Sequence, residues 1–448
     1  MGVTGGWSFL YFIFITALST FFETGEKMNK WNIDSLAPRV ERFGLLDEKQ
    51  RNQLVEQMNR HFPPPVFNWQ LERRRKALEN SEKGKKLLSD AAQEFPPFMP
   101  WQNVSFSPES LNGYGVVFTA GGEGERLRTS LLARGADPHS LKDFTKATYP
   151  LENFFQDFGA LHINLALIAS FCKKNNLDIP VIITTGPKGS ITERVIPRIL
   201  EEKEYFGLKN VRIVAQEQRL HFTKDEKIAY TVENNTPNPV TQPDETGGPL
   251  MILKQKPDTK NLSCLEWLET LGCSKIILAQ ATAIYDQTML PLMAQAAKQH
   301  DCIGVGVLRD QFPPDDPFGT FIAVKKNSDK KTCIIEQAIR NEITRNIKDP
   351  KNKFFLPFNT GFYALDCNLL KESDLPDYAT PPKEITPELP RSPKVGYAAT
   401  DILPMANNPL ILTIDPKMYA VIKTAEDLTR LSQAARDFGL LDICKKSI

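Results

Sequence analysis

The chain has 448 residues, 41% of them hydrophobic, which is enough for a large buried core and for more than one domain. Its 55 basic residues are balanced by 54 acidic ones, so no overall field is present to hold nucleic acid or an anionic membrane, and an anion site must be local. The seven cysteines are odd in number and contain no CxxC pair, which argues against a zinc cage or a disulfide framework and fits a reducing cytoplasm.

Residues 1–27 are interpreted as an apolar leader. The run 7–22 is uncharged but somewhat short for a membrane span, which needs ~20 apolar residues. It also lacks the basic region of a secretory signal, since the first charged residue is Glu23. The favoured interpretation is an over-extended reading frame with the true start near Met28; a membrane anchor and a signal peptide are the alternatives. A membrane partner is expected only if residues 7–22 are retained.

Residues 28–111 are expected to form a helical region outside the catalytic domain. Asp47 and Gln50 match a capping box at the start of one helix, and the prolines at 63–65 must end that helix. The basic stretch 73–76 has acidic residues around it, so a solvated helix face is favoured over a phosphate-binding patch.

Residues 112–380 are predicted to form the catalytic domain. Short apolar runs alternate there with amphipathic stretches, which indicates an α/β fold with a mainly parallel sheet covered by helices on both faces. Strands are expected at 116–119, 181–185, 211–215, 275–279 and 303–308, and helices near 156–174, 190–203 and 286–299. Ligands of such sheets lie at the carboxyl ends of the strands.

A small carboxyl-terminal region, residues 381–448, completes the chain. The proline-rich stretch 367–400, which leads into it, is expected to be mostly loop. A last strand is predicted at 410–414 and a closing helix from Ala425.

A glycine-rich segment follows the first predicted strand. Gly121 and Gly122 can bring backbone N–H groups close to a polyphosphate, and Arg126 can supply a planar fork of donors. The competing interpretation is a tight turn that needs positive φ. The spacing is neither a Rossmann fingerprint nor a P-loop. The segment GGEGERL instead resembles the GGxGTRL signature of the sugar-nucleotide pyrophosphorylases, most closely their UDP-N-acetylhexosamine branch, with Glu125 in place of the family's threonine.

Two lysine segments extend this resemblance. FTKATYPL, residues 144–151, is similar to the family's proline-lysine motif, although Thr145 replaces the proline. MYAVIKTAEDL, residues 418–428, is similar to its late lysine motif. The resemblance implies that Lys146 neutralises charge on the α-phosphate and the leaving pyrophosphate, and that Lys423 contacts the sugar phosphate. Arg126, Lys146 and Lys423 are therefore the expected catalytic residues.

The resemblance also implies a site for the uracil base. Residues 205–217 are similar to the family's FFGL…V…FQQG run, which assigns Gln216 to the edge of the uracil, where a side chain with a donor and an acceptor is needed. Residues 243–248 are similar to its PxGxGG loop. The pair Gly247 and Gly248 favours N-acetylglucosamine over glucose as the sugar.

Two further segments are implied to bind the sugar. CIIE, residues 333–336, is similar to the family's VVEY strand, and FNTG, residues 358–361, to its N-x-G turn. By this match Glu336, Asn359 and Gly361 would contact sugar hydroxyl groups.

The family's magnesium-binding aspartate is missing. The corresponding segment reads ILAQAT, with Gln280 at the expected position, whereas Mg²⁺ prefers carboxylate and phosphate oxygens. The residue that holds the metal is therefore unassigned. Either the substrate phosphates and water hold the ion, or another carboxylate such as Asp366 or Asp286 reaches it, or turnover has been lost.

The resemblance implies a three-layer nucleotidyltransferase sandwich around a mixed, mainly parallel, Rossmann-like sheet. The implied activity is that of a magnesium-dependent uridylyltransferase, which forms a UDP-sugar and pyrophosphate from UTP and a sugar 1-phosphate. The product is expected to be UDP-N-acetylglucosamine, or else UDP-glucose. The alternative is a catalytically degenerate binding protein of the same fold, motivated by Gln280 and Glu125. A glycosyltransferase is disfavoured, because Asp315 and Asp316 lie in a proline-flanked loop.

Overall fold

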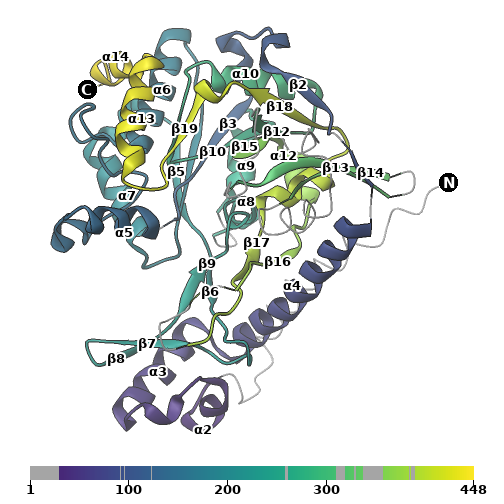
Figure 1. Cartoon of the computed structure of the whole chain (residues 1–448). Coiled ribbons are helices and arrows are strands. Elements are labelled where there is room, and N and C mark those ends of the chain that lie inside the picture. The colour runs from purple at the N-terminus through teal and green to yellow at the C-terminus, as the bar shows by residue number, and fades with distance from the viewer. Residues whose placement is uncertain are drawn as a thin grey trace. The chain divides into compact units, whose positions relative to one another are not determined.

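The computed structural model describes residues 30–90, 92–94, 96–122, 124–257, 261–308, 318–326, 329–335, 357–382, 384 and 389–447. The predicted leader, the sugar-binding candidate Glu336 and the Asp315–Asp316 pair lie outside these residues. The chain divides into two compact units, which are described separately (Figure 1). The larger unit comprises Arg73–Arg219, Thr241–Lys383 and Pro393–Ile448, and the smaller unit comprises the remaining segments.

The larger unit is built on a mixed sheet. Its main strands, in spatial order, are β2 (Phe98–Pro100), β18 (Pro409–Ile414), β12 (Cys302–Val307), β15 (Phe358–Asp366), β10 (Lys275–Gln280), β3 (Tyr114–Thr119), β4 (Val181–Thr185) and β5 (Val211–Ala215). Along this path β15 is antiparallel to both neighbours and every other pair is parallel. The predicted mixed, mainly parallel sheet is thus confirmed.

Alternating apolar residues bury both faces of the sheet. In β3, Val116 and Phe118 belong to one hydrophobic core, whereas Val117 between them belongs to another, as the period of two in a strand requires. The first core includes residues of α5 (Glu125–Ala133), α6 (Ala160–Asn175), α7 (Ile191–Glu202), α10 (Met289–Ala296), α13 (Glu426–Asp437) and α14 (Leu440–Lys445). The second includes residues of α8 (Gly248–Lys254), α9 (Cys264–Thr270) and α12 (Cys367–Glu372). Helices therefore cover both faces, and the three-layer arrangement is confirmed.

Smaller strands accompany the main path. β13 (Thr320–Lys326) pairs with β14 (Asp329–Ile335), with β15 and with β1 (Ala92–Glu94). Two-stranded sheets are formed by β11 (Ala283–Tyr285) with β19 (Tyr419–Val421), by β16 (Asp377–Ala379) with β17 (Val395–Tyr397), and by β6 (Gln218–Leu220) with β9 (Thr241–Pro243). The stretch 367–400, expected to be mostly loop, therefore contains a helix and a strand pair.

One expected turn is in fact the start of a central strand. Residues 358–361 were predicted to form a sugar-binding turn, but they begin β15, which lies between β10 and β12. Polar residues and a glycine with φ +77° make this segment a poor strand former locally. Pairing of Phe358 and Asn359 with β12, and of Phe358 with β13, overrides that preference.

The smaller unit has a hydrophobic core of its own. This unit includes α2 (Ile33–Leu36), α3 (Glu48–His61), the beginning of α4 (Pro64–Asp90) and the hairpin of β7 (Tyr230–Glu233) and β8 (Thr236–Pro239). The predicted capping box is confirmed, since Asp47 Oδ1 accepts the Gln50 N–H at 2.8 Å and Gln50 Oε1 accepts the Asp47 N–H at 3.0 Å. Trp31 packs edge-on against Phe67, with the ring centroids 5.3 Å apart, inside this core.

The expectation of a solvated basic stretch at 73–76 on α4 is confirmed for Arg75 and Lys76, which are exposed, but was wrong for Arg73 and Arg74. Arg73 is 6% exposed and Arg74 is 4% exposed. Arg73 forms an ion pair with Asp377, and its guanidinium carbon lies 4.3 Å from the centroid of the Tyr397 ring. A buried arginine of this kind needs a charged partner, and a pattern of charges along one helix cannot reveal a partner that is distant in sequence.

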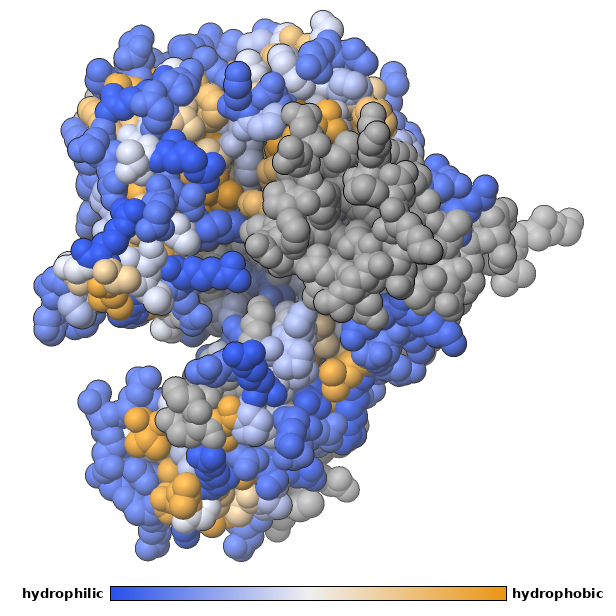
Figure 2. All heavy atoms as spheres, viewed as in Figure 1, coloured by the Kyte–Doolittle hydropathy of each residue, from blue (hydrophilic) through white to orange (hydrophobic). Residues whose placement is uncertain are grey.

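The surface of the described residues is mainly hydrophilic. On the face seen in Figure 2, apolar residues form small groups among hydrophilic ones. Within the part of the chain that the structure describes, no helix is both long and apolar enough to cross a membrane.

Candidate functional site

The site lies at one edge of the large sheet. Because β3, β4, β5 and β10 are parallel, their carboxyl ends meet at the same edge, which we call the carboxyl edge. β15 runs in the opposite direction, so its first residues also lie there. The predicted residues Gly121, Gln216 and Gly361 therefore follow or begin strands at this edge.

The glycine-rich segment connects β3 to the beginning of α5. Gly124 is the residue before this helix and has φ +73°; a Cβ on it would lie 2.7 Å from the Cβ of Lys146. Gly122 is exposed and a Cβ on it would meet nothing within 4 Å. Gly124 thus provides the positive φ of a tight turn, and Gly122 leaves open space beside bare backbone.

The three predicted cations are close enough to influence one another. Burial first, and then the positive charges of Lys423 and Arg126, lower the pKa of Lys146 to about 8, although Asp427 opposes them. The Lys146 Nζ also donates a hydrogen bond of 3.3 Å to the carbonyl of Ile422. The structure therefore brings together residues from three distant segments, and the concentrated positive charge favours an anion.

The turn that carries Lys423 is held by the first turn of α13. Asp427 Oδ2 accepts the backbone N–H of Lys423 at 2.7 Å and that of Thr424 at 2.9 Å. Its other oxygen accepts a hydrogen bond of 2.8 Å from Arg430. The Lys423 Nζ lies 5.3 Å from the centroid of the Phe318 ring. Asp427 belongs to the late lysine motif at residues 418–428, but the motif match gave it no role.

Gln216 lies between two of the predicted glycines. A Cβ on Gly121 would be 2.3 Å from Gln216 Nε2, and a Cβ on Gly248 would be 2.7 Å from Gln216 Oε1. Gln216 is 6% exposed, and its Oε1 has no hydrogen-bond partner among the described residues. Both glycines are thus needed for the amide to fit, and the amide retains an unused acceptor.

Gly247 has a structural role in the same loop. Its N–H donates to the carbonyl of Tyr397 at 2.7 Å, and a Cβ on it would lie 2.7 Å from the Cβ of Tyr397. The glycine therefore allows the loop to approach β17 closely. It does not by itself show a contact with a ligand.

The two described sugar-binding candidates, Asn359 and Gly361, contact each other at the beginning of β15. Asn359 Oδ1 accepts the Gly361 N–H at 2.9 Å and the Tyr363 hydroxyl at 3.1 Å. Gln280 Nε2 donates to the carbonyl of Thr360 at 3.0 Å, and a Cβ on Gly361 would be 2.2 Å from this nitrogen. Gln280 is therefore packed directly against the segment 359–361.

The described residues do not provide a resident magnesium site. No group of three or more His, Cys, Asp or Glu side chains among them could hold a metal ion, and Gln280 offers an amide where Mg²⁺ prefers a carboxylate. Asp366 pairs with Lys275 at the beginning of β10, the edge opposite the site. Asp286 accepts the Thr288 N–H at 2.9 Å and so caps its own turn. Asp366 thus lies at the edge away from the site, and Asp286 is engaged through Oδ1.

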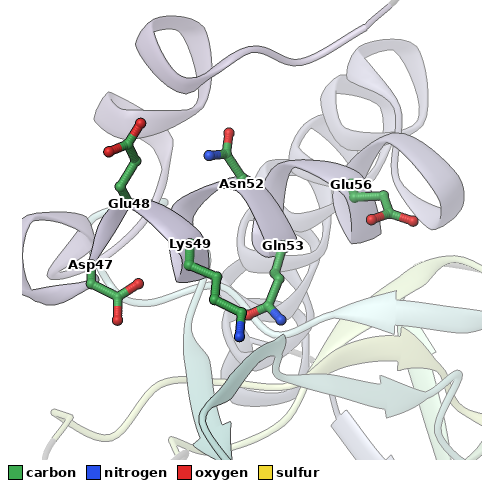
Figure 3. Close-up of a pocket in the computed structure, with 6 residues that line it drawn as sticks. All are labelled: Asp47, Glu48, Lys49, Asn52, Gln53 and Glu56. Carbon is green, nitrogen blue, oxygen red and sulfur yellow. The ribbon is translucent and has the colours of Figure 1, made fainter.

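A depression on α3 is not a competing site. Figure 3 shows that it is lined by polar side chains of this one helix, and these residues are Asp47, Glu48, Lys49, Asn52, Gln53 and Glu56. Among them Asp47 is the helix cap. No glycine-rich backbone or cluster of cations accompanies them.

Comparisons with known proteins agree with this geometry at the level of the fold. No protein-family model matches the sequence, and no curated protein matches it significantly. Among solved structures, the chain is similar to the UDP-N-acetylglucosamine pyrophosphorylase of Trypanosoma brucei in complex with an inhibitor, with a TM-score of 0.63 and 15% identity over 94% of this chain and 84% of that one.

The chain is also similar to solved structures of proteins named for UDP-glucose. The UDP-glucose phosphorylase of Trypanosoma brucei has a TM-score of 0.54 and 15% identity, over 75% of this chain and 71% of that one. A variant of UDP-glucose pyrophosphorylase from Leishmania major in complex with UDP-glucose has a TM-score of 0.53 and 14% identity, over 76% and 70%. The chain has the fold of the UDP-sugar pyrophosphorylases, and the resemblance seen in its motifs is confirmed at that level.

Proposed function

We propose that this protein is a uridylyltransferase that forms a UDP-sugar and pyrophosphate from UTP and a sugar 1-phosphate. The observation that carries the proposal is the convergence of Arg126 and Lys423 on Lys146, which packs against Gly124 of the glycine-rich segment at the carboxyl edge of this fold. Two cations that lower the pKa of a third, Lys146, are costly to hold together unless an anion compensates them. A triphosphate and a phosphate monoester would do so.

The reaction is a displacement at phosphorus. An oxygen of the sugar phosphate attacks the α-phosphorus of UTP, the bond from that phosphorus to the α,β-bridging oxygen breaks, and pyrophosphate leaves with the electron pair. The nucleophile is already an anion, so no general base is needed. Catalysis then consists of positioning and charge neutralisation. We assign Arg126 and Lys146 to UTP and Lys423 to the sugar phosphate.

The uracil base is assigned to Gln216. Its Oε1, which lacks a partner among the described residues, would accept the N3–H of uracil, and its Nε2 would donate to a ring carbonyl. Gly121 and Gly248 would bound this pocket, since both touch the amide.

The sugar is proposed to be N-acetylglucosamine, with glucose as the second choice. The pair Gly247–Gly248 supports this preference, as does the likeness to a UDP-N-acetylglucosamine pyrophosphorylase over 94% of the chain. Asn359 and Gly361 would bind the sugar, and Glu336 stays a prediction. Magnesium is proposed to arrive with UTP, held by its phosphates and water. We place the reaction in the cytoplasm, without a nucleic-acid partner, and with a membrane partner only if residues 7–22 are retained.

The test is a coupled pyrophosphate assay with UTP and other nucleoside triphosphates against a panel of sugar 1-phosphates, with and without Mg²⁺. Pyrophosphate release is expected with UTP, and fastest with N-acetylglucosamine 1-phosphate. A degenerate binding protein is the second candidate, motivated by Gln280. It would bind UTP or a UDP-sugar in calorimetry and release no pyrophosphate from any pair.

A further inference from the structure

Two segments that are distant in sequence form the proposed base pocket. One follows β5 and carries Gln216, and the other leads into α8 and ends at Gly248, the first residue of that helix. The Gln216 amide touches Gly248 closely, so its position depends on how these segments are held together.

A buried ion pair connects the two segments. Arg219, three residues after Gln216, donates to Asp244 through two hydrogen bonds, from Nε to Oδ1 at 3.0 Å and from Nη2 to Oδ2 at 2.7 Å. Their side chains are only 6% and 4% exposed. Arg219 Nη2 also lies 3.1 Å from Glu217 Oε2, and Glu217 Oε1 accepts a hydrogen bond of 2.8 Å from Gln255. Arg219 and Gln255 thereby also hold Glu217, the residue next to Gln216, in place.

The other side of the Gly248 loop is held by backbone hydrogen bonds. The Tyr397 N–H donates to the Asp244 carbonyl at 3.2 Å, and the Gly247 N–H donates to the Tyr397 carbonyl at 2.7 Å. The Tyr397 ring lies 4.3 Å from the guanidinium carbon of Arg73 and 5.9 Å from that of Arg219. β17 therefore supports the loop through Asp244 and Gly247, and Arg73 packs against Tyr397 of β17.

Stability is a weak explanation for this arrangement. Removing two charges from water costs several kcal/mol per ion, and replacing a buried ion pair by apolar side chains is often neutral or stabilising. What a bidentate pair provides is a defined distance and orientation between two backbones. In this protein the pair fixes the distance and orientation of the backbones near the neutral Gln216 amide, which is proposed to contact the uracil base.

We propose that Arg219 and Asp244 are positioning residues that set the separation of Gln216 and Gly248 and thereby the selectivity for the uracil base. This inference rests on the proposed function. It extends that function to residues with no direct role in the chemistry, and none of the sequence motifs assigned them one.

The test compares Asp244→Asn with Asp366→Asn in the full chain. The second variant removes a partner of an ion pair with Lys275 at the opposite edge of the sheet. Binding of UTP and CTP is measured by calorimetry, and KM is measured for both substrates. Asp244→Asn is expected to weaken UTP binding about tenfold and to reduce the preference for UTP over CTP, while KM for the sugar phosphate and kcat change less than about twofold. Asp366→Asn is expected to change none of these.

Arg219→Lys provides a second variant in case Asp244→Asn does not fold, because it keeps the charge and loses the bidentate geometry. Unchanged UTP affinity and unchanged selectivity for UTP over CTP in a folded variant would overturn the inference. Equal increases in KM for UTP and for the sugar phosphate would also overturn it. If the unaltered protein binds UTP but releases no pyrophosphate, only the proposed function fails and the binding comparison still decides. If it binds no nucleotide, both fail.

Discussion

The pKa of the Lys146 ammonium group is lowered to about 8, because the group is buried and the cations Lys423 and Arg126 lie near it. Above that pH the group loses its proton and its attraction for phosphate. We therefore expect kcat/KM for UTP to fall as pH rises through about 8, since this ratio reports the free enzyme. Lys146→Arg should shift the fall to higher pH, because a guanidinium stays protonated. A profile from about pH 6 to about pH 10 that is identical in both proteins would contradict this assignment.

Gly121 and Gly122 are neighbours with different physical roles, which a pair of alanine variants can separate. In Gly121→Ala the new Cβ would lie 2.3 Å from Gln216 Nε2, so the amide must move. We expect a stability loss of about 1–3 kcal/mol from overpacking and weaker UTP binding. Thermal unfolding and calorimetry measure the two effects.

Gly122→Ala serves as the matched variant. Its Cβ would meet no protein atom within 4 Å, so the melting temperature should stay close to that of the unaltered protein. UTP binding should still weaken, because the methyl group would occupy space proposed for the phosphates. If Gly122→Ala binds UTP normally, the phosphates do not pass this backbone.

Gln280 allows a test of the metal requirement. Gln280→Asp would place a carboxylate at the carboxyl end of β10, and carboxylates bind Mg²⁺ better than amides. We expect the Mg²⁺ concentration for half-maximal turnover to fall about tenfold or more. Gln280→Asn, which is as short but uncharged, should not lower it. An equal response in the two variants would show that the metal does not approach this position.

The first turn of α13 is the element that presents Lys423. We expect Lys423→Ala to reduce kcat by about 100-fold and to leave UTP binding largely intact, since one cation at a reacting phosphate typically contributes that much. Asp427→Asn should reproduce part of this loss, because the carboxylate accepts the Lys423 N–H at 2.7 Å. Asp437→Asn, at the other end of α13, is the control. Stopped-flow turnover and UTP calorimetry distinguish this result from a loss of nucleotide binding.

β15 shows why element prediction failed in one place and succeeded in others. Strands with apolar runs, such as β4 and β10, are recognisable from local pattern, and their observed bounds agree with the predicted ones to within one residue. β15 begins with polar residues and contains Gly361 at φ +77°. Its pairing with β10 and β12 comes from segments far away in the chain. Local propensity carries no information about such partners.

At the scale of the whole molecule, the described chain has two units, each with its own hydrophobic core, and the proposed UTP site belongs to the larger one. A ligand that binds only the folded state stabilises it, by about 2.7 kcal/mol at 100 times its Kd. We therefore expect saturating UTP to raise the melting temperature. The double variant Arg126→Met, Lys146→Met should lose this shift. An equal shift in both proteins would place the nucleotide elsewhere.

The amino-acid sequence by itself determined the α/β class and the positions of most parallel strands, because apolar periodicity is a local property. Its resemblance to the pyrophosphorylase motifs supplied most residues of the proposed site. Only the tertiary structure decided that Arg73 is buried against Asp377 and Tyr397, and that Arg219 joins Asp244. These contacts unite residues hundreds of positions apart, or a residue of β6 with one that follows β9, and complementary charge is common in any sequence. Whether two charges meet depends on how the backbone folds between them.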